Sequence, residues 1–462
     1  MNWQQLLCEE RPGRIEYGAG GSDLRNEFEK DYHRIIVSAS FRRLQDKTQV
    51  FPLDKSDFIR TRLTHSLEVS SVARSLGQIV GASIMKSGLD PAFTARQKAD
   101  ICDILQCAGL IHDIGNPPFG HFGEETIREW FALQLPKLSY KGKPVVSLLR
   151  PEHLADLTGF EGNAQGLRMV SKLDYPVHQD GLNLTYGVLS ATLKYTASAK
   201  AASPKSRAAA GKKVGYFTSE KELFEAIQSH TGTDGRRSPL AVLLEAADDI
   251  AYATADIEDA FKKGFFNFET FRKELHQRGA AKSYRDRLSD LYDMARLSGA
   301  VDPEESAVRS WLREMQDVLI VAAADSFIEH YAELMEGSYE KELVSSRTAA
   351  VLLKALKTIA YDYAFTSMSI YKTEIAANRI MTTLLEMLVP AALLFDETQT
   401  GLMEEKYLSL IPVNYGLVCR KASDGRELSD VLYARLQMAL DTVSGMTDSY
   451  ARDLYTELVG IR

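Results

Sequence analysis

Four side chains of the kinds that bind divalent metal ions lie in three separate segments of this chain. They are His65 in RTRLTHSLEV, His112 and Asp113 in AGLIHDIGNPPFGHFGEE, and Asp248 in LEAADDIAYATAD. Two imidazoles and two carboxylates form a mixed nitrogen and oxygen ligand set that suits Mn²⁺, Fe²⁺, Zn²⁺ or, less well, Mg²⁺. A metal ion held in this way can polarise a phosphoryl oxygen, so the four residues predict a site for the hydrolysis of phosphate esters.

Helical periodicity predicts that His112 and Asp113 share one helix end. In residues 101–112 the apolar positions recur at intervals of three and four, which indicates a helix with His112 on its buried face. Asp113 is about 100° further round that helix, so both side chains reach one ion only where the backbone turns away. Glycine and proline in residues 115–118 predict that turn.

The other two segments carry comparable patterns. His65 lies in the first turn of a second amphipathic helix, so its side chain is expected to point inward. In the third segment Asp248 lies at the edge of the buried face, and Tyr252 and Asp256 follow on the same row. Asp249 is rotated away from that row, and we therefore expect the fourth metal ligand to be Asp248.

Ordinary core packing is the alternative to a metal site. An inward histidine is more often a hydrogen-bonded core residue than a metal ligand, and this interpretation applies to each residue taken alone. Four ionisable groups on three inward helix faces would, however, be costly to bury without a cation. Their combination therefore favours a metal site.

Composition limits the class of protein. With 462 residues the chain can bury a sizeable core in one large domain or two. Its formal net charge of -8 argues against a general nucleic-acid coat, so a polyanionic substrate would need a local cationic pocket. The four cysteines form no CxxC pair, and no segment approaches 18 uncharged apolar residues. These features predict a cytoplasmic protein with reduced thiols and no membrane-spanning segment.

Long helical patterns dominate and predict an all-α fold, with short strand candidates only near 408–419. We expect an N-terminal segment at 1–29, a metal-binding catalytic core at 30–265 and a further helical region at 266–462. Within the core, the stretch 196–215 is rich in Ala, Ser and Lys. It is either a solvated mobile loop or a flap that meets a triphosphate or single-stranded DNA. Its basic residues are Lys200, Lys205, Arg207, Lys212 and Lys213.

The order of several motifs resembles that of the bacterial dGTPase-like group of HD-domain deoxynucleoside triphosphate triphosphohydrolases. FRRLQDKTQVFPL, RTRLTHSLEV, HDIGNPPFGHFGE, FEGNAQ and EAADDIAY follow one another between about residues 30 and 265, and SGMTD recurs at 444–448. The resemblance implies an all-α HD-domain fold, a divalent metal ion, above all Mn²⁺ or Mg²⁺, and hydrolysis of a dNTP to deoxynucleoside and tripolyphosphate. It favours dGTP as substrate and implies a homo-oligomer, often a hexamer, with single-stranded DNA or a second nucleotide as a candidate effector.

The resemblance also assigns roles by matching motif. His121 and Glu124 in GHFGEE resemble the catalytic pair, and their spacing would place them together at the start of the next helix. His121 would act as general acid or base, and Glu124 would orient it. The family's metal ligands are matched by His65, His112, Asp113 and Asp248.

Five further residues resemble the family's substrate contacts. Arg62 and Asn116 would lie at the phosphates, where a guanidinium can bind bidentately. Tyr252 and Asp256 would pack on the deoxyribose and bond its 3′-OH, and a ring against C2′ would exclude ribonucleotides. Gln49 would lie near the sugar and base.

The sequence leaves two C-terminal features open. Lys354 and Lys357 are candidates for the β- and γ-phosphates, but their segment LLKALKTIAYDY departs from the family pattern. SGMTD at 444–448 is either a helix end that packs against the core or a contributor to a neighbouring subunit's site.

Two rival functions remain. HD-class phosphodiesterases add two later histidines to build a two-metal site, and His153 and His178 follow the doublet here. PEHLADL and YPVHQDG lack the adjacent-histidine pattern of those enzymes, so we expect both to be loop or surface residues. The other rival is a nucleotide-sensing or single-stranded-DNA-binding regulator with little turnover, against which the complete ligand set and catalytic pair argue.

Overall fold

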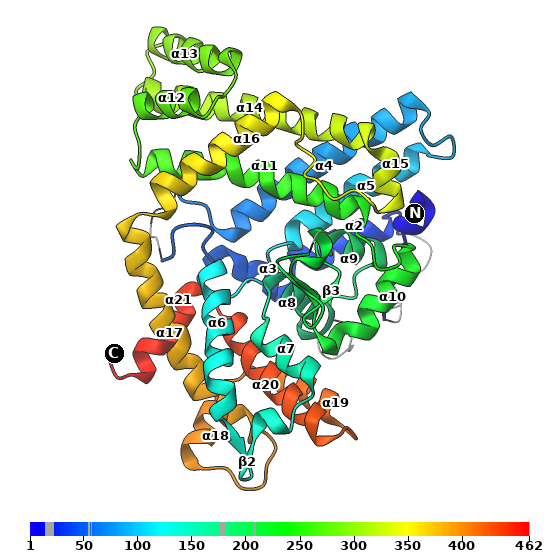
Figure 1. Ribbon diagram of the computed structural model, residues 1–462, viewed down its shortest axis with the longest axis vertical. Coiled ribbons are helices and arrows are strands. Elements are labelled where there is room, and N and C mark those ends of the chain that lie inside the picture. Colours follow the sequence, from blue (N-terminus) through cyan, green and yellow to red (C-terminus); the bar gives the residue numbers. More distant parts are fainter. Residues whose placement is uncertain (14–22, 54–55, 57, 175–180, 207–208, 462) are drawn as a thin grey trace.

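The chain is almost entirely helical. The computed structural model describes residues 1–13, 23–53, 56, 58–174, 181–206 and 209–461 (Figure 1). Helix accounts for 69% and strand for only 2%. The all-α prediction is therefore confirmed.

The first half of the described chain holds eleven α-helices and two short strand pairs. Strand β1 (Ser139–Tyr140) pairs antiparallel with β2 (Lys143–Pro144), and β3 (Ala197–Ser198) pairs in parallel with β4 (Val214–Tyr216). The helices are α1 (Trp3–Leu6), α2 (Glu27–Ile36), α3 (Ala39–Arg43), α4 (Arg62–Ser87), α5 (Ala95–Ile111), α6 (Gly120–Gln134), α7 (Pro151–Thr158), α8 (Gly162–Arg168), α9 (Tyr186–Thr192), α10 (Lys221–Thr231) and α11 (Pro239–Lys262).

The second half of the described chain adds ten more α-helices and a π-helical turn, Tyr361–Phe365. The helices are α12 (Phe268–Gln277), α13 (Lys282–Leu297), α14 (Pro303–Glu329), α15 (Tyr331–Glu336), α16 (Arg347–Ala360), α17 (Met368–Ala392), α18 (Leu402–Ser409), α19 (Val413–Ser423), α20 (Leu428–Ser444) and α21 (Asp448–Leu458).

Helices α4, α5 and α11 pack against one another and bring the three metal-ligand segments together. The α4–α5 contact is close because residue 109 is glycine, and a Cβ there would lie 2.5 Å from the Cα of Ser70. Helices α14 and α16 cover α11 on its other sides (Figure 1). Farther along the chain, α17 packs against α6, α20 and α21, so the C-terminal third touches the helix that begins near His121.

One continuous apolar core joins these helices. Among the described residues it reaches from Trp3 in α1 to Leu454 in α21. Burial of this much apolar surface is the main stabilising contribution to a fold of this size. The proposed division of the chain at residues 29 and 265 stays a prediction.

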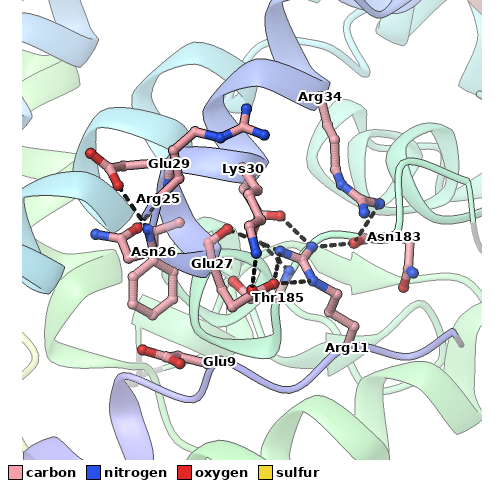
Figure 2. Close-up of polar contacts among 12 residues, drawn as sticks. Glu9, Arg11, Arg25, Asn26, Glu27, Glu29, Lys30, Arg34, Asn183 and Thr185 are labelled. Carbon is pink, nitrogen blue, oxygen red and sulfur yellow. Dashed lines mark hydrogen bonds and ion pairs between the residues drawn. The ribbon is translucent and has the colours of Figure 1, made fainter. Parts of the chain in front are cut away.

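The N-terminal segment is anchored by a buried ion pair (Figure 2). The Arg11 guanidinium bonds both Glu27 and Asp31 of α2 and donates to the backbone oxygen of Asn183 at 2.5 Å. The side chain of Asp31 is fully buried and that of Arg11 is 3% exposed. We call Arg11, Glu27 and Asp31 the N-terminal ionic cluster.

The expectation of short strands near 408–419 is wrong. This segment contains the end of α18 and most of α19. Tyr415, Gly416 and Cys419 are the buried residues of α19, and their spacing of one, three and four positions is that of a helix face packed against α20. The apolar run was too short for its period to be read correctly, because Pro412 interrupts it at the helix start.

The four cysteines form no disulfide with one another. Cys102, Cys107 and Cys419 are buried and Cys8 is half-buried. Within the described ranges, no helix combines the length and the apolar character that crossing a membrane requires.

Candidate metal centre

Helix starts and ends place the predicted ligands. His65 lies in the first turn of α4, which begins after Thr61 because the Thr61 and Thr64 side chains each accept from the other's backbone N–H. His112 caps the C-terminal end of α5, and the chain turns away over residues 113–119. Asp248 comes from the middle of α11. The three predicted helices and the helix end after His112 are therefore confirmed.

The ligand atoms of His65, His112 and Asp113 all lie within 4.8 Å of one another. Asp248 joins this group, because its Oδ1 is 3.1 Å from His65 Nε2 and 3.6 Å from His112 Nε2. His112 Nε2 is also 3.6 Å from Asp113 Oδ1. We call these four residues the candidate metal cluster, and their side chains surround one point between three helices.

The orientation of His112 fits a metal ligand. Its Nδ1–H donates to the carbonyl oxygen of Gly109 at 2.8 Å, which leaves the lone pair of Nε2 toward the cluster. That Nε2 is buried and has no hydrogen-bond partner. A buried polar atom without a partner is costly, and a bound cation would satisfy it. The residues present therefore fit a divalent ion.

The cluster attracts positive charge. Burial disfavours the charged form of Asp113, but Arg62 and His112 hold its pKa at about 2. Burial alone would lower the pKa of His112, yet Asp113 and Asp248 raise it to about 9. The two ionised carboxylates thus favour any cation at this point, whether a proton on His112 or a metal ion.

Two predicted phosphate ligands orient Asp113. Arg62 donates to Asp113 Oδ2 at 2.6 Å, and the Asn116 side-chain amide donates to Asp113 Oδ1 at 2.6 Å. Arg62 is 4% exposed, and its Nε is buried without a partner. Both residues line the cavity beside the cluster, so they hold the carboxylate and remain within reach of a ligand.

His121 and Glu124 form a pair at the start of α6. His121 Nδ1 donates to Glu124 Oε2 at 3.1 Å, and the backbone N–H of Gly162 in α8 donates to the other oxygen at 2.8 Å. Glu124 is 1% exposed whereas the His121 side chain is 78% exposed. Although burial favours the neutral acid, the bond to His121 lowers the pKa of Glu124. A fixed anion therefore orients an accessible imidazole.

A cavity of about 540 Å³ opens beside the cluster. His112, Asp113, Asp248 and His121 line it, whereas His65 lies behind its wall. The lining also contains the aromatic and apolar residues Phe119, Phe122, Tyr195, Tyr252, Phe365 and Ile370. The cavity therefore offers the candidate metal cluster, a histidine and ring surfaces to one ligand.

Two lysines line this cavity that the sequence did not single out as ligand contacts. Lys194 lies 3.3 Å from Glu245, and Lys213 lies 3.2 Å from Glu161. Lys213 belongs to the basic stretch 196–215, so the flap interpretation of that stretch contained the signal. Lys194 stands just before the stretch and had no such signal.

The other residues of the basic stretch include both exposed and buried side chains. Lys200, Lys205 and Lys212 are exposed, as a solvated loop requires, while Val214 of β4 is buried. Arg207 lies outside the described residues.

The predicted sugar contacts lie at two depths. Tyr252 and Gln49 line the cavity, and Gln49 Oε1 is buried without a partner. Asp256 lies behind Tyr252, is 3% exposed and is not part of the described lining. Burial together with the nearby Asp256 carboxylate raises the pKa of Tyr252. Asp256 thus lies near the tyrosine hydroxyl.

The lysines of α16 do not line the cavity in the described structure. Lys357 pairs with Asp249 at 2.8 Å, and Asp249 is itself a lining residue. Lys354 is exposed. Asp249 is therefore turned from the cluster toward a cation of its own, consistent with the choice of Asp248.

The expectation that His153 is a loop or surface residue is wrong. It lies in α7, is 1% exposed and stacks on Tyr433 of α20 at 4.1 Å between ring centroids. The ring is held between α7 and α20 by this stacking and by a hydrogen bond between its Nδ1 and the Ser429 hydroxyl. It lines no part of the described cavity, so a second metal site is not supported there. His178 lies outside the described residues.

Comparison with known proteins identifies similar chains. The family model for the HD domain matches residues 62–158, which include His65, His112, Asp113 and the His121–Glu124 pair. A deoxyguanosinetriphosphate triphosphohydrolase-like protein of Listeria monocytogenes is 43% identical over 100% of both chains. One from Synechocystis is 34% identical over 100% of both chains, and a deoxyguanosinetriphosphate triphosphohydrolase of Enterobacter is 30% identical over 100% of this chain and 98% of its own.

Proposed function

The chain belongs to the deoxyguanosinetriphosphate triphosphohydrolase family, and from this premise we propose that it hydrolyses dNTPs, dGTP first among them, to deoxynucleoside and inorganic tripolyphosphate. An HD domain implies a divalent metal ion. The observation that carries the proposal is that four candidate metal-binding side chains meet beside a cavity of about 540 Å³, which His121 also lines.

We assign His65, His112, Asp113 and Asp248 as the ligands of Mn²⁺ or Mg²⁺, with Fe²⁺ and Zn²⁺ compatible with the same donor set. When bound, the ion supplies a Lewis acid for a phosphoryl oxygen. The protein's own contribution is orientation, since Arg62 and Asn116 each hold one oxygen of Asp113. Held ligands lose less freedom on binding than mobile ones.

His121 is the proposed proton carrier. Water attack at the α-phosphorus breaks the bond to O5′, and this oxygen needs a proton to leave as the nucleoside hydroxyl. The His121 imidazole is exposed to the cavity, and its Nδ1–H is bonded to Glu124, so Nε2 faces outward. Glu124 fixes the orientation of the ring through this bond.

Three cations of the lining would receive the phosphates: Arg62, Lys194 and Lys213. Each is paired with a carboxylate, and a triphosphate would replace or share those partners. This arrangement supplies the local cationic pocket that a chain of net charge -8 needs for a polyanion.

The sugar and the base would occupy the aromatic part of the cavity. Tyr252 would pack against C2′ and exclude a 2′-OH, and Asp256 would fix the tyrosine from behind. Glu374 also lines the cavity, and its carboxylate can accept from the adjacent N1–H and N2–H groups of guanine. Adenine offers an acceptor at N1 instead. This contact supports dGTP as the preferred substrate, with Gln49 as a further polar neighbour.

The test is a product assay with each dNTP and with GTP under Mn²⁺ and Mg²⁺, resolving nucleoside, diphosphate, tripolyphosphate and pyrophosphate. We expect deoxynucleoside and tripolyphosphate in equal amounts, fastest with dGTP, and neither product from GTP. Pyrophosphate, a diphosphate or no turnover would contradict the proposal and favour a phosphodiesterase or a nucleotide sensor.

Glu374→Gln tests the base contact. Loss of one charge-assisted hydrogen bond is worth about 1.5–3 kcal/mol, so the preference for dGTP over dATP should fall roughly 10- to 100-fold in kcat/KM. Glu125→Gln is the control, because Glu125 is a neighbouring carboxylate outside the described lining. An unchanged preference for dGTP over dATP would contradict the proposed contact between Glu374 and guanine.

We also propose a cytoplasmic homo-oligomer that single-stranded DNA or a second nucleotide regulates. Family resemblance alone supports these features. Light scattering of the purified chain would measure its mass, and a monomer that is fully active would contradict the oligomer.

A further inference from the structure

A buried carboxylate outside the cavity holds two segments of its wall. Asp448 is the first residue of α21 and ends the SGMTD motif. Although it is 2% exposed, Asp448 Oδ1 accepts from the backbone N–H of Phe119 at 2.9 Å, and Oδ2 accepts from the backbone N–H of Thr48 at 3.0 Å. The Thr48 hydroxyl also donates to Oδ2. All three donors lie more than 300 residues earlier in the chain.

Both segments that Asp448 holds line the cavity. Thr48 precedes Gln49, and Phe119 ends the turn that leads through Gly120 to His121. Phe119 has a φ of 64°, in the left-handed region that residues with a side chain seldom adopt. Such a conformation costs on the order of 1–3 kcal/mol and persists only where neighbouring groups fix it. The Asp448 carboxylate is one of those groups.

A second contact ties the same pieces of chain together. The ammonium of Lys47, which is 2% exposed, donates to the carbonyl oxygens of Asn116 at 2.5 Å and Ser444 at 2.9 Å. The SGMTD motif therefore meets the turn 116–119 at both of its ends. Its contact with the core is made within one chain, as the first of the two interpretations of this motif expected.

We propose that Asp448 is a positioning residue for the reaction, which fixes the left-handed turn before α6 so that His121 faces the reacting phosphate. The inference rests on the proposed function and deepens it. Asp448 does not line the described cavity. It acts by accepting the hydrogen bond from the Phe119 N–H, which fixes the direction of the chain as it enters α6 near His121. A misplacement of about 1 Å in such a group can cost on the order of 100-fold in rate.

The test compares Asp448→Asn with Asp156→Asn in the full chain. Asp156 is a matched control, because it is 3% exposed and accepts from the Thr218 N–H at 2.7 Å and the Tyr433 hydroxyl at 2.5 Å, away from the cavity. We expect similar decreases in unfolding temperature from both variants. Only Asp448→Asn should lower kcat, by roughly 10- to 100-fold at saturating dGTP and Mn²⁺. Equal kcat values for the two variants would overturn the proposal.

A double-mutant cycle separates positioning from general loss of structure. If Asp448 acts through His121, Asp448→Asn should cost little further kcat once His121→Ala is present. A merely structural role would multiply the two losses, and that result would contradict the proposal. Thr48→Val removes only the hydroxyl donor, and it should lower kcat less than Asp448→Asn does. Thr48→Val replaces Asp448→Asn in this test if Asp448→Asn does not fold. An unchanged kcat in Thr48→Val would then contradict the positioning role of Asp448.

Hydrogen exchange makes the test independent of turnover. In a peptide 116–122, Asn116 carries the N-terminal amine and Pro117 and Pro118 have no amide, so the signal reports on residues 119–122. Exchange there should be faster in Asp448→Asn than in the wild type or Asp156→Asn. If the wild type releases no tripolyphosphate, the proposed function fails. Amide exchange in this peptide still tests whether Asp448 fixes the turn. Equal exchange rates in Asp448→Asn and the wild type would refute the positioning role of Asp448 but not the proposed function.

Discussion

Two groups of buried charges in this molecule differ in whether the protein alone satisfies them. The N-terminal ionic cluster joins Arg11 to Glu27 (Figure 2). Arg11 also pairs with Asp31. The candidate metal cluster joins two histidines to two aspartates between α4, α5 and α11. Both take ionisable side chains from segments far apart in sequence and remove them from water, which is costly unless they are paired.

The N-terminal ionic cluster is complete. Each guanidinium nitrogen of Arg11 donates to an acceptor, and Asp31 Oδ2 accepts from the backbone N–H of Thr185 at 2.9 Å. Lys30 pairs with Glu27 at 2.7 Å, so two cations face two carboxylates. Such a cluster needs no ligand and serves to hold chain segments together.

The candidate metal cluster is incomplete. Arg62 balances Asp113, whereas the ion pairs of Asp248 among the described residues are with the imidazoles of His65 and His112. His112 Nε2 lies 3.6 Å from the nearest carboxylate oxygens. His65 Nδ1 is also buried without a partner. A functional site can therefore be recognised by the polar atoms that the fold itself leaves unsatisfied.

The largest effect is expected from His112→Ala. Turnover should fall by at least about a thousandfold, the loss that follows removal of a group central to charge stabilisation. The unfolding temperature without added metal should also fall, since the variant loses the Nδ1–H bond to Gly109 and the attraction between His112 and the two carboxylates. Initial rates of tripolyphosphate release and a thermal scan measure the two quantities. Retained turnover would place the chemistry elsewhere.

Arg11→Ala should lower stability and leave turnover almost unchanged. It leaves Asp31 fully buried and without its cation, and breaking a buried pair in this way costs about 3–5 kcal/mol of unfolding free energy. Denaturant unfolding measures the loss. Turnover of the folded fraction at low temperature should be close to that of the wild type. A tolerated Arg11→Ala would mean that this cluster does not hold the N-terminal segment.

Metal addition should stabilise one cluster only. At a free Mn²⁺ concentration of 100 times Kd, ligation of the native state adds about 2.7 kcal/mol to the unfolding free energy. Wild type and Arg11→Ala should both gain this increment, and His112→Ala should not. An equal gain in His112→Ala would locate the ion at another site.

The smallest effect is expected from Glu27→Gln at the rim of the N-terminal ionic cluster. Burial favours the neutral acid, but Lys30 and Arg11 lower the pKa of Glu27 below 4.5. Its contribution is therefore present above pH 4.5 and lost as pH falls through the lowered pKa. Since the side chain is 30% exposed, the variant should cost under about 1 kcal/mol at pH 7. The difference in unfolding free energy between the variant and the wild type should shrink as the pH falls below 4.5, and a difference that does not change with pH would contradict this expectation.

Local patterns in the sequence predicted the helices that carry the site, because residues 101–112 and the row from Asp248 to Asp256 repeat with the helical period. They could not predict that Asp256 lies behind Tyr252, since depth depends on how α11 packs against its neighbours. Lys194 and Asp448 were equally hidden. Their partners, Glu245 and Phe119, are 51 and 329 residues away, and only the fold brings them together.

The most direct test of the incomplete cluster is the amount of metal that the chain retains. Wild type, His112→Ala and Arg11→Ala would be dialysed against the same buffer containing Mn²⁺, Mg²⁺, Fe²⁺ and Zn²⁺ under anaerobic conditions and analysed by mass spectrometry for bound metal. The account predicts one divalent ion per chain in the wild type and in Arg11→Ala, and none above background in His112→Ala. Equal metal content in His112→Ala and the wild type would contradict it.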